Sequence, residues 1–184
     1  MTERRYLLDT NIFIAASRGY YHFDICPDFW TMLIEQNQNG RVLSIKPVKE
    51  EILPKTKKSK KDDAQEDDAP KYDRLALWVK DEAPKSLFAD CDDLMVMKSY
   101  REIIQSVQAN RQYFDRAKDE FATVADSWVI AYAHAHTLTV VTHENNSKDA
   151  KKRVLIPTVC EEFDVPVATL FEMLLDLKVK FVRK

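Results

Sequence analysis

Short apolar runs alternate with longer segments of helical spacing along the whole chain. The first run, 6–8, is too short for a helix and ends on the carboxylate of Asp9, which indicates a buried strand with this residue at its end. Four later runs are further candidate strands: 42–45, 138–142, 154–156 and 165–167. Because helical segments separate these runs, the pattern predicts an α/β fold with a central parallel sheet and helices on both faces.

Several shorter helical segments are marked by residues that begin or end helices. Pro27 begins one segment, which Gly40 ends. Pro47 lies at an early position of the next. Two more segments, 72–80 and 170–177, carry apolar residues available for burial. These helices complete a three-layer α/β/α arrangement.

Two longer helices are expected in the second half of the chain. The segment 94–108 follows two aspartates, and one side of it is expected to run through Leu94, Met97, Arg101, Ile104 and Val107 or Gln108. A second stripe at helical spacing places Phe121 and Tyr132 on one helix. Further apolar residues widen this stripe until the helix is apolar nearly all round, which predicts a helix in the middle of the fold.

Composition narrows the class of protein. The 184 residues, 45% of them hydrophobic, suit a single domain, 1–184, with a full core. A formal charge of −2 gives no global positive field, so contact with nucleic acid would need a local patch. Only two glycines occur, which excludes a P-loop and a dinucleotide-binding fingerprint.

The expected location is cytoplasmic. Three widely spaced cysteines without a C-x-x-C pair indicate reduced thiols. The N-terminal residues lack the apolar region of a signal peptide. No apolar stretch approaches the length of about 20 residues that a membrane span needs, so no membrane contact is expected.

The segment 55–70 interrupts the alternation. It holds five lysines followed by five acids, with no apolar residue larger than Ala. Nothing in it offsets the entropy cost of ordering, so it is expected to form a mobile charged loop inserted in the domain. The alternative is that its lysines reach a phosphate backbone or a partner.

Acidic residues recur where a strand ends or a helix begins. They are Asp9 after the first strand, Glu50 and Glu51 after the second, Asp126 near the start of the buried helix, and Glu144 after the third strand. In a doubly wound sheet these places share one edge. Carboxylates gathered there would raise one another's pKa or bind a cation, and all-oxygen ligands suit Mg²⁺ or Mn²⁺ and phosphodiester hydrolysis.

Each acid also has a structural alternative. Asp9 and Asp126 are suited to cap a helix N-terminus. The helix dipole favours glutamates in a first turn, and Glu144 would then be an ordinary loop residue. Coincidence of all of them at one sheet edge is less expected than one cluster. The aromatic segment 20–23 has two interpretations as well, base stacking and core packing, and core packing is favoured.

Six segments resemble, in order and spacing, the PIN-domain superfamily of metal-dependent nucleases. They are 6–14 (YLLDTNIFI), 21–30 (YHFDICPDFW), 42–52 (VLSIKPVKEEI), 125–133 (ADSWVIAYA), 140–144 (VVTHE) and 156–160 (IPTVC). The chain is most similar to an uncharacterised bacterial PIN-like family related to VapC-type toxins. The resemblance spans nearly the whole chain apart from the charged loop.

The resemblance implies which acids form the site. The family's four acidic positions fall on Asp9, Glu51, Asp126 and Glu144. Glu51 is preferred to Glu50 because the family's acid directly precedes an aliphatic residue, here Ile52. Many PIN nucleases carry Asp or Asn where this chain has Glu144, whose longer side chain changes the distance to a metal.

Three polar neighbours complete the expected site. By the resemblance, Asn11 supports Asp9 with a hydrogen bond and Thr142 lies beside the cluster. His143 is a candidate to contact a phosphate or to act as an acid, and an exposed loop histidine is the alternative.

The resemblance implies a metal-dependent endoribonuclease that uses Mg²⁺ or Mn²⁺. RNA would be its substrate, an antitoxin protein encoded nearby would be its partner if it is a toxin, and a homodimer is a candidate assembly. One alternative is a catalytically inactive PIN-like module that binds RNA or protein. Another is a phosphoacceptor domain that uses Asp9, which usually needs a second aspartate where this chain has Asn11.

Overall fold

The computed structural model describes residues 3–54, 73–147 and 149–181. Its centre is a five-stranded sheet in which every pairing is parallel, in the order β3-β2-β1-β4-β5. The strands are β1 (Tyr6–Leu8), β2 (Val42–Ile45), β3 (Phe88–Ala89), β4 (Thr139–Val141) and β5 (Val167–Ala168). The predicted α/β fold with a central parallel sheet is therefore confirmed.

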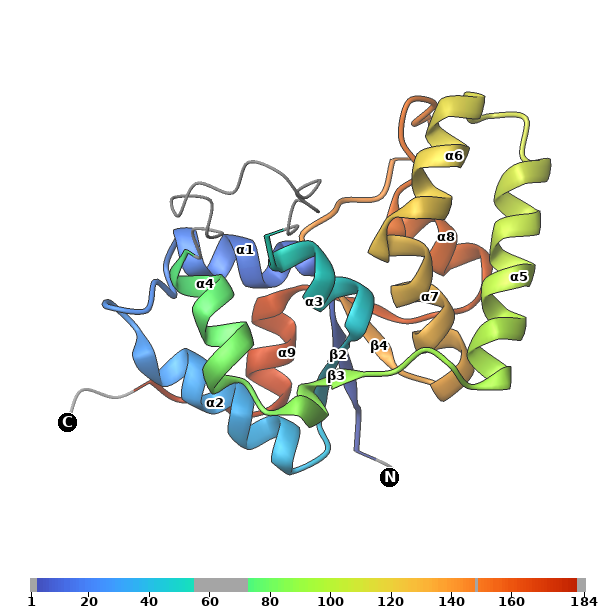
Figure 1. Ribbon diagram of the computed structural model, residues 1–184. Coiled ribbons are helices and arrows are strands. Elements are labelled where there is room, and N and C mark those ends of the chain that lie inside the picture. Colours follow the sequence, from blue (N-terminus) through green and yellow to red (C-terminus); the bar gives the residue numbers. More distant parts are fainter. Residues whose placement is uncertain (1–2, 55–72, 148, 182–184) are drawn as a thin grey trace, which may run out of the picture.

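Helices cover both faces of the sheet, which gives the predicted three-layer α/β/α arrangement. Figure 1 shows α1, α2, α4 and α9 on one side of the strands and α5, α6, α7 and α8 on the other. The α-helices are α1 (Thr10–Arg18), α2 (Pro27–Gln38), α3 (Lys46–Ile52), α4 (Arg74–Leu77), α5 (Leu94–Ala109), α6 (Asp115–Thr123), α7 (Ala125–His136), α8 (Ile156–Glu162) and α9 (Leu170–Asp176). A π-helical turn, Trp78–Glu82, continues α4, and a 3₁₀ turn, Lys85–Leu87, precedes β3.

The middle strand β1 is buried along its whole length, because it pairs on both sides and helices cover it. Tyr6 lies opposite Val42 of β2 and Thr139 of β4. Aromatic rings extend the core beneath α2: Phe23 stacks on Trp30 with ring centroids 3.9 Å apart, and Tyr21 stacks on Phe29 at 4.3 Å. Core packing is thus the correct interpretation for these two residues of the aromatic segment 20–23, whereas Tyr20 is exposed.

The buried side of α5 differs from the prediction. Leu94 is 88% exposed and Met97 is also exposed, whereas α5 buries Val96, Ser99 and Ile103. Of the predicted side, Val107 is buried as expected. Two polar contacts with α7 explain why a different side of α5 faces inward. Asp93 caps α5 and lies 3.0 Å from Nε2 of His136, and Ser99 lies 2.9 Å from Nδ1 of His134. These polar pairs with α7 fix which side of α5 faces inward.

The predicted continuous helix through Phe121 and Tyr132 is two helices. Val124 adopts an extended conformation, with φ −101° and ψ 168°, so α6 ends before it and α7 begins after it. The prediction failed because helical spacing of apolar residues persists across the break. The break matters for the site because it creates a helix N-terminus at Ala125, next to Asp126.

Two strand predictions also need correction. The segment 154–156 is not a strand, since α8 begins at Ile156 with Pro157 in its first turn. The sheet instead contains β3, which the sequence did not predict because its two residues are too few to produce an alternating pattern. The strand expected at 165–167 is confirmed only in its last residue, where β5 begins.

The charged segment 55–70 lies outside the residues that the structure describes. Within the described ranges, none of the helices is long and apolar enough to cross a membrane.

Candidate functional site

The acidic residues gather at the point of the sheet where the strand order changes direction, between β1 and β4. The order β3-β2-β1-β4-β5 makes β1 and β4 neighbours, although the connections from each run outward in opposite directions. Open α/β sheets bind ligands at the carboxyl ends of the strands at such a point. Asp9 directly follows β1, and Thr142 directly follows β4.

Asp9 is fully buried at this point and does not cap a helix. It occupies the N-cap position of α1, but its side chain makes no capping hydrogen bond. Its Oδ2 accepts hydrogen bonds from Thr142 Oγ1 at 3.0 Å and from Asn11 Nδ2 at 3.4 Å. Its buried Oδ1 has no hydrogen-bond partner among the described residues. The carboxylate is therefore held in place while one oxygen is left for another ligand.

Asp126 is the second buried acid, and it is not an N-cap either. It lies in the first turn of α7, whose N-cap is Val124, and it is 8% exposed. Burial, together with the negative charges of Asp9 and Glu144, raises its pKa to about 7, and the positive charge of Arg153 opposes this shift. Burial and the charge of Glu144 together raise the pKa of Asp9 to about 6, against the opposing effect of the hydrogen bond from Thr142. The acids thus lie close enough to affect one another's charge.

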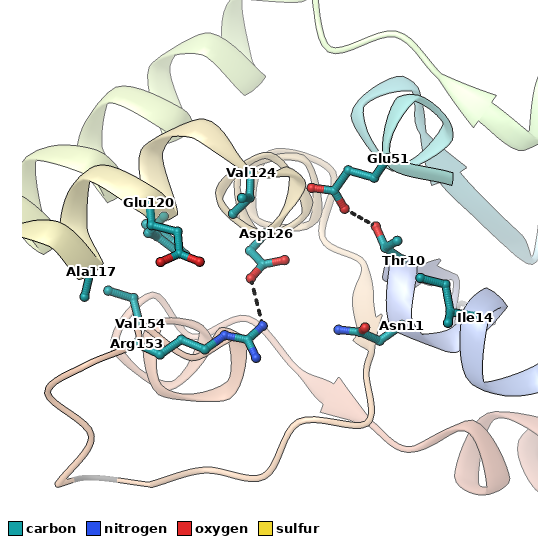
Figure 2. A pocket seen from close by; sticks show the side chains of 11 residues that line it. Thr10, Asn11, Ile14, Glu51, Ala117, Glu120, Val124, Asp126, Arg153 and Val154 are labelled. Carbon is teal, nitrogen blue, oxygen red and sulfur yellow. Dashed lines mark hydrogen bonds and ion pairs between the residues drawn. The ribbon is translucent and has the colours of Figure 1, made fainter. Parts of the chain in front are cut away.

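Glu51 joins three elements at the edge of the site. Its Oε2 accepts a hydrogen bond from Thr10 Oγ1 at 2.6 Å, and its Oε1 accepts one from the backbone N–H of Ala125 at 2.8 Å. Glu51 of α3 therefore caps α7 and ties it to α1, as the contact with Thr10 in Figure 2 illustrates. Both glutamates are exposed, but the charge of Glu50 acts on Lys46 and Cys91, whereas that of Glu51 acts on Asp9 and Asp126. Of the two glutamates, Glu51 is the one that lies in the cluster.

We expect Glu51→Ala to lower the free energy of unfolding by about 1 kcal/mol, because α7 loses the acceptor for its first N–H. Glu51→Gln keeps an amide oxygen at that place and should lose less. Urea denaturation of both variants measures the difference, with Glu50→Ala as the matched control on the adjacent exposed residue. Equal losses for Glu51→Ala and Glu50→Ala would contradict the capping role.

Glu144 reaches the site from the segment that follows β4. Its side chain is 8% exposed, and its Oε2 accepts a hydrogen bond from the backbone N–H of Ile156, the first residue of α8, at 2.8 Å. Its Oε1 lies 2.6 Å from Nη2 of Arg153. The longer side chain of a glutamate is used here to cap α8 and to pair with a cation. His143 is exposed beside it, with no hydrogen bond or ion pair within the described part of the chain.

A pocket of about 410 Å³ opens over the cluster. Its polar lining consists of Thr10, Asn11, Glu51, Glu120, Asp126 and Arg153, drawn in Figure 2. Asp9 and Glu144 do not line it, but they contact its wall through Asn11 and Arg153, respectively. Four acids predicted to form the site are therefore brought together, two at the pocket surface and two beneath it.

The pattern of the sequence did not mark three of these lining residues. Thr10 follows Asp9 in an apolar run, Glu120 lies on α6 before the unexpected break, and Arg153 ends a short basic run before a segment predicted to be a strand. The one available signal was the basic run 151–153, since a cation near several acids is a candidate counter-ion.

The site fits a hard divalent cation only in part. Within 3–54, 73–147 and 149–181, no group of three or more His, Cys, Asp or Glu side chains is placed to hold a metal ion. Mg²⁺, however, keeps several waters and binds through one or two carboxylates. The partnerless Oδ1 of Asp9 and the neighbouring carboxylate of Asp126 supply such a pair. These two carboxylates are the side chains that would hold a metal ion, with waters completing its coordination.

Fold and site together define a parallel α/β protein of Rossmann-like topology with an acidic pocket at its switch point. The family model described as "Domain of unknown function (DUF4411)" matches residues 6–181, and the chain belongs to this family. Neither the curated proteins nor the solved structures contain a match to the chain.

Proposed function

We propose that this protein is a PIN-like, metal-dependent endoribonuclease that hydrolyses phosphodiester bonds of RNA. One observation carries the proposal: a fully buried aspartate, Asp9, keeps one oxygen without a hydrogen bond beside other carboxylates that repel it. Burying an unpaired charge is costly, so such an arrangement calls for a cation. The resemblance of the sequence to PIN nucleases supports the same assignment.

In this proposal Asp9 and Asp126 hold Mg²⁺ or Mn²⁺ directly. The bound metal would polarise a phosphoryl oxygen and lower the pKa of a water. Thr142 and Asn11 orient Asp9 by hydrogen bonds to Oδ2, which leaves Oδ1 for the ligand. Glu51 holds α1, α3 and α7 together around the pocket, and Glu144 contributes charge from beneath it. His143, exposed beside Glu144 in the sequence, is a candidate contact for a phosphate.

The second candidate function is a PIN-like module that binds RNA or protein without cutting. The hydrogen bonds of two glutamates favour this function. Both oxygens of Glu51 and one oxygen of Glu144 accept hydrogen bonds from the backbone or a side chain, so these oxygens are not available to a metal in this arrangement. The phosphoacceptor alternative is weaker, because Asn11 donates to Asp9 where such domains usually need another carboxylate.

Cleavage of labelled RNA separates these functions. We expect the purified protein to cut RNA internally in Mn²⁺ or Mg²⁺ and to stop when EDTA is added, because the metal would activate the water that attacks the phosphodiester. Product length on a denaturing gel distinguishes internal cuts from trimming. Binding of RNA without cleavage in either metal would favour the non-catalytic module.

The proposed partners rest on the resemblance alone. They are an antitoxin protein if the nuclease is a toxin, and a second copy of the chain in a homodimer. A cytoplasmic location is proposed on the same basis and on the reduced cysteines, which are free among the described residues.

A further inference from the structure

A positively charged side chain already lies among the acids of the pocket. Arg153 extends from the segment before α8, and its Nη2 lies 2.6 Å from Oε1 of Glu144 and 3.6 Å from Oδ2 of Asp126. Figure 2 shows the Arg153 side chain extending toward Asp126, with a dashed line for their ion pair. One nitrogen thus contacts two of the four acids of the cluster.

The two carboxylates that Arg153 contacts are shielded from water, whereas Arg153 is not. The side chains of Glu144 and Asp126 are 8% and 11% exposed, and that of Arg153 is 56% exposed. The carboxylates therefore need a counter-charge that water does not fully provide. Arg153 provides it while keeping access to solvent, so its guanidinium can leave without opening the core.

The next residue anchors this arrangement. Val154 is buried, while 151–153 are exposed. Departure of the guanidinium requires rotation of one long side chain rather than movement of the backbone at Val154. Arg153 forms its ion pairs with Asp126 and Glu144, and Oδ1 of Asp9 has no hydrogen-bond partner among the described residues.

We propose that Arg153 is an internal cation of the acidic site, which neutralises Asp126 and Glu144, competes with a divalent metal for Asp126 and is displaced when the metal binds. The inference rests on the proposed metal site. The inference goes beyond the proposed metal site because it gives Arg153 an effect of its own. Arg153 weakens metal binding, and it stabilises the metal-free protein. A guanidinium that positions Glu144 for the metal would do the reverse.

Titration calorimetry with Mn²⁺ alone tests the competition. We expect Arg153→Gln to bind Mn²⁺ about five- to tenfold more tightly than the wild type, because the metal no longer displaces an ion pair. Arg153→Lys keeps the charge and should stay near the wild type. Lys152→Gln is the matched control, since it removes the same charge from the adjacent exposed residue and should change the affinity less than twofold. Unchanged or weaker binding by Arg153→Gln would overturn the inference.

Thermal unfolding in EDTA gives the second readout. Arg153→Gln should lower Tm because two shielded carboxylates lose their counter-charge, and adding Glu144→Gln should recover most of the loss. A Tm equal to that of Lys152→Gln would overturn the inference. Absence of Mn²⁺ binding by both the wild type and Arg153→Gln would overturn the inference together with the proposed metal site. Mn²⁺ binding by the wild type that Arg153→Gln leaves unchanged would overturn the inference alone, and the proposed metal-dependent function would stand.

Discussion

Asp9→Asn is expected to reduce metal-dependent RNA cleavage at least about a hundredfold. Even groups that only orient a metal ligand are worth roughly 10–100-fold, and Asp9 is proposed as a direct ligand. The amide keeps an oxygen that can accept from Thr142 and Asn11, so the packing around the residue should remain. What it removes is the negative charge on the atom that has no other partner, Oδ1.

The effect is measured as kcat/KM for labelled RNA at saturating Mn²⁺. Asp119→Asn, the same substitution on an exposed residue of α6, is the control and should leave cleavage unchanged. Thermal shift gives a readout that does not depend on activity: a metal at a hundredfold excess over Kd stabilises a folded protein by about 2.7 kcal/mol, and Asp9→Asn should lose most of this gain. Cleavage that survives both Asp9→Asn and Asp126→Asn would refute the catalytic assignment.

The parts of the fold that were predictable from the sequence depend on local patterns. A short apolar run that ends on Asp9 specifies a buried strand and the side chain at its end, because burial on both faces of a parallel sheet needs an unbroken apolar run. The same holds for the strand before Thr142. Once both strands are placed, a parallel sheet brings their carboxyl ends to one edge, and the meeting of Asp9 with Thr142 follows.

What was not predictable depends on contacts between distant segments. The side of α5 that faces inward is fixed by polar pairs with α7. The spacing of apolar residues alone predicts that Leu94 is buried, whereas the structure exposes it. The break at Val124 has no helix-breaking residue to mark it. It is stabilised by Glu51, which lies far away in the sequence and caps the new helix end at Ala125.

Arg153 shows the same limit at the site itself. The four acids were found because each ends a strand or begins a helix, a property that the sequence carries locally. Arg153 lies in an irregular segment, and only the fold brings it to Glu144 and Asp126. The sequence-based prediction therefore gave the site a more negative net charge than the structure does.

Removal of metal should make the stability of this protein fall as pH rises from about 5 to 8. Burial and neighbouring acids raise the pKa of Asp9 to about 6 and that of Asp126 to about 7, against about 3.9 in an unfolded chain. Between about pH 4 and pH 7 the folded protein holds protons on these two carboxyls that the unfolded chain has released, so raising the pH favours unfolding. The associated stability is complete below about pH 4 and is lost once both groups ionise. At about 1.4 kcal/mol per pKa unit, the two acids cost roughly 2–4 kcal/mol over this range.

Asp126→Asn isolates the larger of the two shifts. Because an amide never ionises, the metal-free variant should gain on the wild type as pH rises, and the difference in unfolding free energy should widen by about 2 kcal/mol from pH 5 to pH 8. Urea denaturation in EDTA at both pH values measures it, and Asp119→Asn should show no such widening. Saturating Mg²⁺ at pH 8 should reverse the order, because only the wild type then has two carboxylates to share with the cation. A constant difference between variant and wild type at the two pH values would mean that Asp126 carries no buried charge, and the repulsion on which the metal site depends would be absent.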